Sequence, residues 1–373
     1  MPSKRIRHYC VDCGAEFPHG FTPRCPSCRG MVEVEYDLAH ARIRESDRPL
    51  ERYFDLLPIL ERESLLSVGE GNTPCRHAGR LGEALGLDRV YLKIESMNPT
   101  GTTKDRMAVT VLYMFHELGL REFVTSSTGN SSNALAYAIQ RHPHFRMHLF
   151  MGEAFRARFR YEGPGVEVHA LDGMDFSEAF AHARDLAHAQ DLPFEGGFFN
   201  PARREGLKTA YFEAVDQIPG DIDWYFQASS SAMGVNGTAK GAGELLAMGR
   251  IGHIPRMVCV QQESCSPMVS AFEEGSATIQ PHHIVEKPRG IAEAILRGNP
   301  SGCYPYVYRM LRATNGVAVR VSETEILEAQ QQVLELEGVA CCTDAATTVA
   351  ALRALAAAGT VQRHEVALLN LTG

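Results

Sequence analysis

The stretch ESMNPTGTTKDRMA, residues 95–108, places Lys104 after a run of proline, glycine and threonine and before an apolar, helix-like segment. Asn-Pro-Thr-Gly is typical of a turn, so we expect Lys104 in the first turn of the helix that follows. There the helix dipole and the neighbouring Arg106 both disfavour an ammonium, which lowers the pKa of the lysine and favours the neutral amine that Schiff-base chemistry needs. An ordinary surface lysine in a first helical turn is the alternative reading of this stretch.

Three more segments carry small polar residues where expected strands end. TSSTGNSSNALA (125–136) combines hydroxyls, a glycine and an amide, and QASSSAMGVNGTAKGAGE (227–244) is rich in serine, glycine and alanine. Backbone N–H groups and hydroxyls at the start of a helix suit a carboxylate or a phosphate. The third segment, LLNLTG, ends a buried strand at Thr372. A helix cap or a tight packing turn is the plainer explanation of any one of them.

Four of the ten cysteines form two Cys-x2-Cys pairs, Cys10 with Cys13 and Cys25 with Cys28. Two such pairs can present four thiolates to Zn²⁺, and a site with no open position is structural rather than catalytic. Two disulfides or four unrelated thiols are the alternatives. The other six lack ligand spacing and are interpreted mostly as small buried hydrophobes: Cys75, Cys259, Cys265, Cys303, Cys341 and Cys342.

The elements that must position these residues alternate along the chain. Short apolar runs predict strands at 89–94, 146–151, 166–171, 223–228, 256–261, 317–322 and 365–371. Amphipathic spacing predicts helices at 104–119, 132–142, 175–189, 205–218 and 323–338. Alternation of strand and helix indicates an α/β architecture with mainly parallel sheets, in which ligands bind at the carboxyl ends of the strands.

Composition excludes several classes of protein. With 373 residues, 45% hydrophobic and 22% charged, the chain is long enough for two globular domains. A formal net charge of -8 argues against nonspecific electrostatic binding of nucleic acid. The basic N-terminal run SKRIRH lacks an apolar segment after it, so we expect no signal peptide, and no apolar run is long enough for a membrane span. We therefore expect a cytoplasmic protein without a nucleic-acid or membrane partner.

From about residue 65 to its end the chain resembles the pyridoxal-phosphate enzymes of fold type II, and within them the threonine synthase family. An N-terminal zinc ribbon followed by EVEYD is also frequent in that family. The matching segments are GEGNTPC, LKIESMNPTGTTKDR, SSTGNSSNALAYA, NPARREGLKTAYFEAV, QQESCSPMVSAFEEG, GIAEAILRGNP, EGVACCTDAATTVAAL and LTG.

The resemblance implies pyridoxal 5'-phosphate as cofactor. Lys104 matches the lysine that binds it covalently and serves as the base at the substrate Cα. Asn130 matches the asparagine at the ring hydroxyl, and Thr372 the hydroxyl at the pyridine nitrogen, a neutral partner that suits elimination and replacement better than transamination. The phosphate loop matches Ser229, Ser230, Ser231, Ala232, Met233 and Gly234.

The resemblance also implies a substrate site. Ser127, Thr128 and Gly129 match the loop that holds the substrate carboxylate. Arg203 aligns with a family arginine and, with Lys208, is the candidate for a leaving phosphate. A basic first turn on a solvated helix is the alternative for these two cations.

Three positions depart from the family pattern. Ser230 and Ala232 stand where relatives carry glycine, and a residue with a side chain does not adopt positive φ cheaply. Thr103 stands where relatives usually carry an aromatic residue. We expect these departures to affect the substrate more than the cofactor.

The resemblance implies an N-terminal zinc ribbon at 1–38 and two three-layer α/β domains with a cofactor cleft between them. The larger, phosphate-binding domain is expected at 65–104 and 205–373, and the smaller, carboxylate-binding domain at 105–204. A homodimer is expected because relatives are commonly dimers.

The implied activity converts O-phospho-L-homoserine and water to L-threonine and phosphate. One alternative is β-replacement, as in cysteate synthase, which acts on O-phospho-L-serine and sulfite, or a specialised biosynthetic enzyme that catalyses β- or γ-replacement. A second alternative is a zinc-ribbon protein that binds without catalysis.

Overall fold

The computed structural model describes residues 6–62, 66–127, 129–174 and 176–373, with the backbone alone at positions 176 and 177. Thr128 lies outside the described residues. The chain divides into two compact units. One comprises Met1–Asn72 and Asn98–Thr209, the other Thr73–Met97 and Ala210–Gly373. Each unit has a sheet of its own, and each is built around its own buried apolar side chains.

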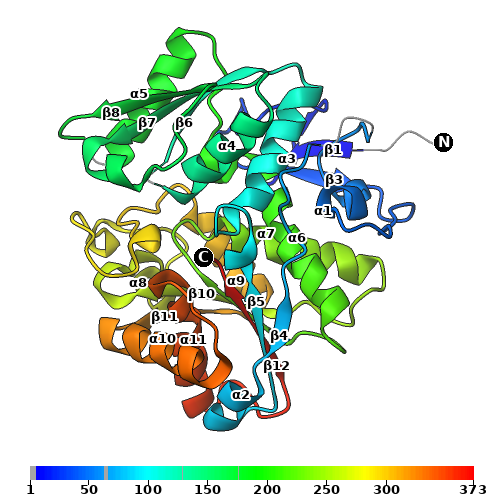
Figure 1. The fold of residues 1–373 in the computed structure, drawn as a ribbon, viewed down its shortest axis with the longest axis vertical. Coiled ribbons are helices and arrows are strands. Elements are labelled where there is room, and N and C mark those ends of the chain that lie inside the picture. Colours follow the sequence, from blue (N-terminus) through cyan, green and yellow to red (C-terminus); the bar gives the residue numbers. More distant parts are fainter. Residues whose placement is uncertain (1–5, 63–65, 128, 175) are drawn as a thin grey trace. The chain divides into compact units, whose positions relative to one another are not determined.

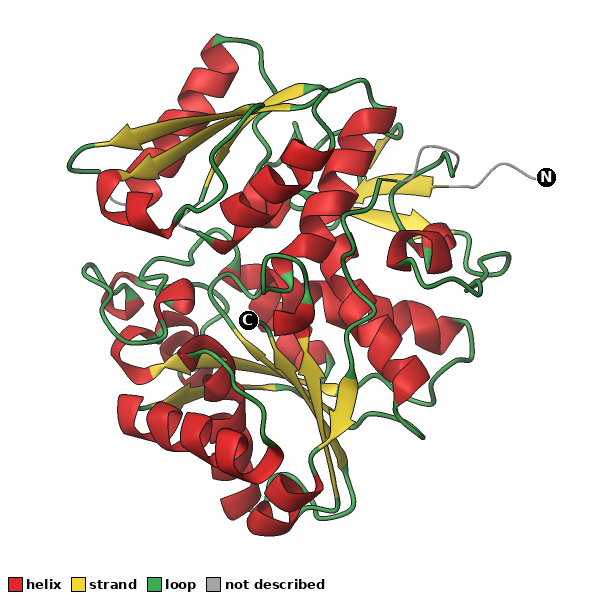
Figure 2. Cartoon of the chain, in the orientation of Figure 1, coloured by secondary structure: helices red, strands yellow, loops and turns green. Residues whose placement is uncertain are grey.

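The second unit is built on a six-stranded sheet with the order β11-β10-β9-β12-β5-β4. Strands are drawn in yellow in Figure 2. Its strands are β4 (Cys75–His77), β5 (Arg89–Ile94), β9 (Trp224–Ala228), β10 (Arg256–Gln262), β11 (Val317–Val321) and β12 (Val366–Leu371). All neighbours are parallel except β4, which runs antiparallel to β5 at the edge. The prediction of mainly parallel sheets is therefore confirmed.

Helices cover both faces of this sheet. They are α2 (Gly79–Leu85), α7 (Met233–Ala247), α8 (Pro267–Glu273), α9 (Tyr304–Ala313), α10 (Glu323–Glu337) and α11 (Thr343–Ala357). Because side chains alternate along a strand, Phe226 and Leu369 pack into the core shared with α10 and α11. Lys93 points to the other face, where its Nζ lies 2.8 Å from a carboxylate oxygen of Glu213 in α6 (Pro201–Gln217). The result is a three-layer unit.

The first unit contains a three-stranded parallel sheet in the order β6-β7-β8 (Figure 1). Its strands are β6 (Glu122–Ser126), β7 (Arg146–Gly152) and β8 (Val166–Leu171). Its helices are α1 (Pro49–Arg52), α3 (Lys104–Glu117), α4 (Asn130–Arg141) and α5 (Phe176–Ala189). Residues 105–115 of α3 are all buried, as expected of a helix that is enclosed on every side.

The N-terminal segment folds as a small antiparallel sheet, order β2-β1-β3, in the same unit. Its strands are β1 (Ile6–Cys10), β2 (Glu16–Phe17) and β3 (Val32–Tyr36). Each cysteine pair closes a tight turn: Gly14 N–H donates to Cys10 O at 2.9 Å, and Arg29 N–H donates to Cys25 O at 2.9 Å. The two turns bring the four thiols to one place.

Seven short 3-10 turns complete the described structure: Phe54–Leu56, Glu95–Met97, Glu153–Arg158, Gly197–Phe199, Glu263–Cys265, Pro281–His283 and Glu293–Ile295. All the strands expected from the sequence are present, as β5 and β7 to β12, and the expected helices are α3 to α6 and α10. The expected elements did not include α7, because its small residues give little apolar periodicity. None of the described helices is long and apolar enough to cross a membrane.

Candidate active site

Lys104 is the first residue of α3 and is half-buried, as its sequence setting predicts. Its backbone N–H donates to Thr102 Oγ1 at 3.0 Å. The fully buried carboxylate of Asp105 accepts from the backbone N–H of Thr100 at 2.8 Å and from its hydroxyl at 2.9 Å. These bonds fold the Thr- and Gly-rich loop back onto the first turn of α3 and so hold the backbone of Lys104 in place.

The helix that carries Lys104 packs closely against the first half of α6. Gly206 has no room for a side chain, because an added Cβ would lie 2.6 Å from Arg106 O. The buried guanidinium of Arg106 donates to Thr209 Oγ1 at 3.2 Å. The position of α3 therefore depends on α6. The expectation that Arg106 lowers the pKa of Lys104 stays a prediction.

The residues that precede α4 form hydrogen bonds with its first turn. Ser127 Oγ accepts from the N–H of Ser132 at 3.2 Å and from that of Gly129 at 3.4 Å. Ser132 Oγ in turn donates to Gly129 O at 2.7 Å. Gly129 has φ 157° and ψ -93°, a conformation open only to glycine. Asn130, the first residue of the helix, is half-buried. The oxygen of Ser127 thus caps the helix.

The first turns of α3 and α4 lie side by side. Ser131 Oγ is 4.0 Å from Met107 Sδ, so the residue after Asn130 contacts the first turn of the Lys104 helix. The structure therefore brings together two of the residues singled out in the sequence, Lys104 and Asn130, on neighbouring helix N-termini.

Arg203 is buried and forms a two-point ion pair with the fully buried Glu195. Its Nε donates to Glu195 Oε1 at 2.5 Å and its Nη2 to Oε2, while Nη1 donates to Ser131 Oγ at 3.1 Å. The carboxylate also accepts from Asn200 Nδ2 at 2.8 Å and from Thr125 Oγ1 at 3.2 Å. Arg203 thus holds the first turn of α4 with a guanidinium whose charge is already balanced.

The other two cations of this run face the N-terminal sheet. Arg204 Nε donates to Glu33 Oε1 at 3.0 Å, and its Nη2 donates to Val32 O at 2.6 Å. Lys208 is fully buried, and its ammonium pairs with Glu205. The ring centroid of Tyr36 lies 4.6 Å from Lys208 Nζ.

These contacts exclude the alternative that the sequence left open for the cations of α6. The run ARREGLK is not the basic turn of a solvated helix, since all three of its cations are buried. Two of them, Arg204 and Lys208, attach α6 to β3. The role of Lys208 at a leaving phosphate stays a prediction, and its buried ammonium pairs with Glu205.

The segment expected to bind phosphate begins at the end of β9. Ser229 is fully buried, and its hydroxyl donates to Gln227 O at 3.0 Å. Ser230 and Ser231 are half-buried and lead to Ala232, which adopts φ 54° and ψ 27° at the head of α7. Ala232 therefore takes the left-handed conformation that glycine takes at no steric cost.

Met233 and Gly234 form the first turn of α7, with both residues buried. A side chain at Gly234 would overlap that of Gln227. Thr372, just after β12, is buried in the same unit. Two residues before it, Asn370 Nδ2 donates to the Tyr225 hydroxyl at 2.7 Å.

Two buried acids that contact or lie near the predicted site residues or their neighbours were missed from the sequence. Glu195 is an isolated acid in PFEGGFFN, and no local pattern marks it as the partner of an arginine. Glu70 lies in GEGNTPC and is almost wholly buried, with Oε2 accepting from Val68 N–H at 2.9 Å and from Ser67 Oγ at 3.0 Å. Burial raises the pKa of the Glu70 carboxyl, although the nearby Arg106 opposes the rise.

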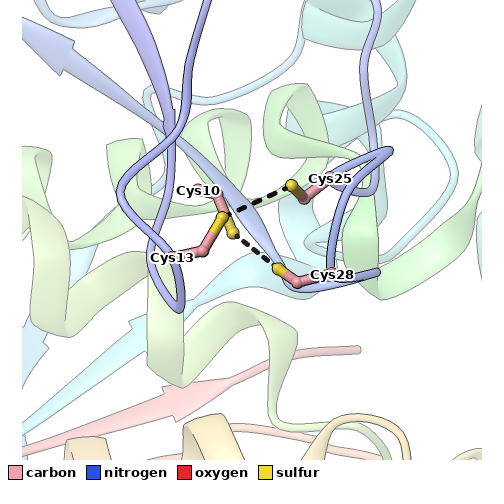
Figure 3. Close-up of side chains that lie close together, drawn as sticks. All are labelled: Cys10, Cys13, Cys25 and Cys28. Carbon is pink, nitrogen blue, oxygen red and sulfur yellow. Dashed lines mark hydrogen bonds between the residues drawn. The ribbon is translucent and has the colours of Figure 1, made fainter.

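The four cysteines of the two pairs meet in one cluster (Figure 3). Cys10 Sγ lies 3.4 Å from Cys28 Sγ, and Cys13 Sγ lies 3.6 Å from Cys25 Sγ. All four are free thiols, so the alternative of two disulfides is not what the structure holds. A tetrahedral metal with metal–sulfur bonds of about 2.3 Å separates its sulfurs by about 3.8 Å, close to these distances. The donor set fits a metal ion.

Known proteins resemble this chain along nearly its whole length. A threonine synthase of Methanosarcina acetivorans is 32% identical over 373 residues, which cover 98% of this chain and 90% of the relative. A threonine synthase of Methanocaldococcus jannaschii is 29% identical over 98% of this chain and 91% of the relative. A cysteate synthase of Methanosarcina mazei is 26% identical over 98% of this chain and 90% of the relative.

Solved structures share the fold at lower identity. The processed form of threonine deaminase isoform 2 from Solanum lycopersicum matches with a TM-score of 0.66 and 19% identity, over 81% of this chain and 84% of that one. Maize serine racemase matches with a TM-score of 0.66 and 16% identity, over 81% and 89%. The sequence profile described as pyridoxal-phosphate dependent enzyme matches residues 66–373. With its lysine at the head of a buried helix, this chain belongs to the pyridoxal-phosphate dependent enzyme family.

Proposed function

We propose that this elimination and replacement enzyme converts O-phospho-L-homoserine and water to L-threonine and phosphate. The supporting observation is the adjacency of the first turns that carry Lys104 and Asn130, in a chain that matches a threonine synthase over 98% of its length. In the overall reaction the Cγ–O bond breaks and the phosphate leaves with the electron pair. Cβ loses one proton and takes a hydroxyl from water, while Cγ gains one proton.

The residues present fit pyridoxal 5'-phosphate. Among the described residues, four buried polar atoms without a hydrogen-bond partner lie beside the expected cofactor residues. Thr103 Oγ1 precedes Lys104, and Ser126 Oγ precedes the loop that begins at Ser127. Thr238 Oγ1 lies on α7 after the phosphate loop, and Asn370 Oδ1 lies two residues before Thr372. Since buried polar groups are nearly always paired, these atoms support a polar ligand in each unit.

We assign Lys104 and Asn130 in the first unit to the cofactor aldehyde and ring hydroxyl. In the second unit we assign Thr372 to the ring nitrogen and the loop 229–234 to the phosphate. When bound, pyridoxal phosphate acidifies the Cα–H of the amino acid attached to it. The Lys104 amine then takes and returns that proton.

Substrate recognition is assigned to the N-terminus of α4. The N–H groups of its first turn have no partners within the helix, and they suit the substrate carboxylate. We assign Ser127, Thr128 and Gly129 to the substrate carboxylate on the resemblance, and the Ser127 oxygen caps the helix. Arg203 acts as a positioning residue, because its Nη1 holds Ser131 while Glu195 balances its charge.

Four further expectations are kept as proposals. We propose that Cys10, Cys13, Cys25 and Cys28 hold a structural Zn²⁺, which suits four thiolates. We propose the division into a ribbon at 1–38, a large domain at 65–104 and 205–373, and a small domain at 105–204. The homodimer and the cytoplasmic location stay predictions of the same kind.

The proposal is tested by phosphate release from the purified, cofactor-loaded protein. O-Phospho-L-homoserine and O-phospho-L-serine are each offered with and without sulfite, and the amino-acid products are identified. We expect phosphate and threonine from the homoserine ester. Lys104→Ala should abolish both this activity and the visible absorbance of the bound cofactor, while Lys287→Ala, at an exposed position, should change neither.

The other outcomes distinguish the alternatives. If phosphate is released from the serine ester and an amino-acid product forms only when sulfite is present, the enzyme catalyses β-replacement. The name of the Methanosarcina mazei relative suggests this reaction. No release from either ester contradicts both substrates. If the protein takes up no cofactor, this result supports the alternative of a zinc-ribbon protein that binds a partner without catalysing a reaction.

A further inference from the structure

A second cluster of metal-binding side chains lies on the small sheet, away from the cysteines. His148 is on β7, and Glu167 and His169 are both on β8. In the parallel register His148 pairs with Glu167, and Phe150 pairs with His169. Because paired residues and residues two apart share a face of a sheet, the three polar side chains lie on one face.

Three ligand atoms converge in this cluster. His148 Nδ1 is 3.3 Å from Glu167 Oε2, and His169 Nε2 is 3.4 Å from Glu167 Oε1. One ligand atom from each residue lies within 4.8 Å of the other two. His169 Nε2 is buried and makes no hydrogen bond among the described residues, so its approach to Glu167 leaves this nitrogen poorly satisfied.

The neighbours of the two rings orient them for binding. Glu122 on β6 lies 2.8 Å from His148 Nε2, so the proton on that nitrogen is donated to a carboxylate. This arrangement leaves the Nδ1 lone pair directed at Glu167, as in metal sites where a carboxylate fixes the tautomer of a histidine ligand. The His169 ring stacks on Phe150 with its centroid 4.3 Å away and the planes 10° apart. Both rings are thus held with nitrogens toward the carboxylate.

We propose that His148, Glu167 and His169 form a second divalent-cation site, with Zn²⁺ as its preferred ion. A cation between the three residues relieves the repulsion between a carboxylate and two nitrogen lone pairs. Two imidazoles and one carboxylate suit Zn²⁺ and its transition-metal neighbours, and they leave a position open to water. The ion joins β8, the edge strand of the sheet, to β7.

A second cluster of one glutamate and two histidines differs from the proposed metal site in its hydrogen bonds. Glu274, His282 and His283 also lie close enough to hold a metal. However, His283 Nδ1 accepts from the N–H of Gln280 at 3.0 Å, so its proton is on Nε2, which donates to Glu274 at 2.9 Å. His282 Nε2 lies 3.0 Å from the same carboxylate. The hydrogen bonds of this cluster are complete without a metal, which makes it a matched control.

The test counts zinc ions per chain in the full-length holoenzyme, dialysed against buffers of fixed micromolar free Zn²⁺. We expect the wild type to hold one ion more than Glu167→Gln or His169→Gln, while His282→Gln retains the wild-type content. Amide hydrogen exchange on the wild type supplies a readout that needs no variant: adding Zn²⁺ should slow exchange in Val166–Leu171. Retained absorbance of the bound cofactor shows that each variant is folded.

Equal zinc content in the wild type and both cluster variants overturns the proposal, as does a second ion that is lost in His282→Gln. A Zn²⁺ effect on exchange confined to the N-terminal sheet overturns it as well. The difference between wild type and variants does not depend on whether the cysteine cluster is filled, nor on which substrate the enzyme takes.

Discussion

Arg203 and Glu195 form a buried two-point ion pair whose arginine also reaches Ser131 at the head of α4, with Nη1 3.1 Å from Ser131 Oγ. The pair links two segments that meet at a helix N-terminus. A cation that the sequence marks for a phosphate thus has a carboxylate partner inside the protein. This relationship changes what mutation of Arg203 is expected to do.

Removing one member of the pair should destabilise the protein strongly. Glu195→Gln leaves a buried guanidinium without its counter-charge, so the free energy of unfolding should fall by about 3–5 kcal/mol. Arg203→Met should cost a similar amount. The double variant should cost clearly less than the sum of the two, because no lone charge remains. Denaturant unfolding measures all three, and strict additivity would contradict the coupling.

Relaxing the strained residue before α7 should stabilise the protein. Ala232 adopts φ 54°, and the left-handed region costs a residue with a Cβ roughly 1–2 kcal/mol. Ala232→Gly should therefore raise the free energy of unfolding by up to about 1 kcal/mol, after the greater freedom of glycine in the unfolded chain is subtracted. Thermal unfolding with the cofactor bound measures this.

Gly234→Ala is the matched control for this prediction, because its Cβ overlaps the side chain of Gln227 and should destabilise the protein. If Ala232→Gly destabilises as well, the left-handed conformation of Ala232 is not under strain.

Loss of the proposed Zn²⁺ from the cysteine cluster should destabilise more of the protein than the N-terminal sheet. Glu33 and Tyr36 on β3 are contacts of the buried cations Arg204 and Lys208, and α6, which carries both, packs against α3. Cys13→Ser should therefore lower the unfolding temperature and the affinity for the cofactor, with a stability loss of about 3 kcal/mol or more if one buried cation loses its partner.

Zinc content, thermal unfolding and cofactor titration measure the three effects. Cys75→Ala, outside the cluster, is the control and should keep the zinc content. A Cys13→Ser variant that loses zinc and keeps full cofactor affinity would show that the N-terminal sheet does not support α3.

Stability should depend on pH through Glu70. Burial raises the pKa of this carboxyl above that of the unfolded chain, which is about 4.3 for glutamate. The folded state then binds a proton more tightly than the unfolded state, so the contribution of Glu70 is most favourable below the unfolded pKa and is lost as the pH rises through the folded pKa.

Glu70→Gln removes the titrating carboxyl group. In the wild type Glu70 Oε1 has no hydrogen-bond partner among the described residues, so the neutral amide breaks no hydrogen bond of that oxygen. The variant should therefore gain stability relative to the wild type as the pH rises, and the two should converge near pH 4. Unfolding measured at several pH values tests this. A difference independent of pH would show that the pKa of Glu70 is the same in the folded and unfolded chains.

The sequence by itself determined the class of fold and the place of the lysine. Strand and helix have different periods, so 89–94 and 166–171 are read as strands from local spacing alone. Turn residues before an apolar run placed Lys104 at a helix start, and paired cysteines predicted a cluster. Each of these inferences depends on residues close together in the chain, where the covalent backbone already restricts the geometry.

Only the tertiary structure decided what the cations of α6 contact. Successive residues of a helix point about 100° apart, so neighbours such as Arg203 and Arg204 face different surroundings. Arg204 meets Glu33, 171 positions away, and Arg203 meets the isolated Glu195. His148 and Glu167 likewise meet through the register of β7 and β8. Such pairings depend on how distant segments pack, and local sequence carries no signal of that packing.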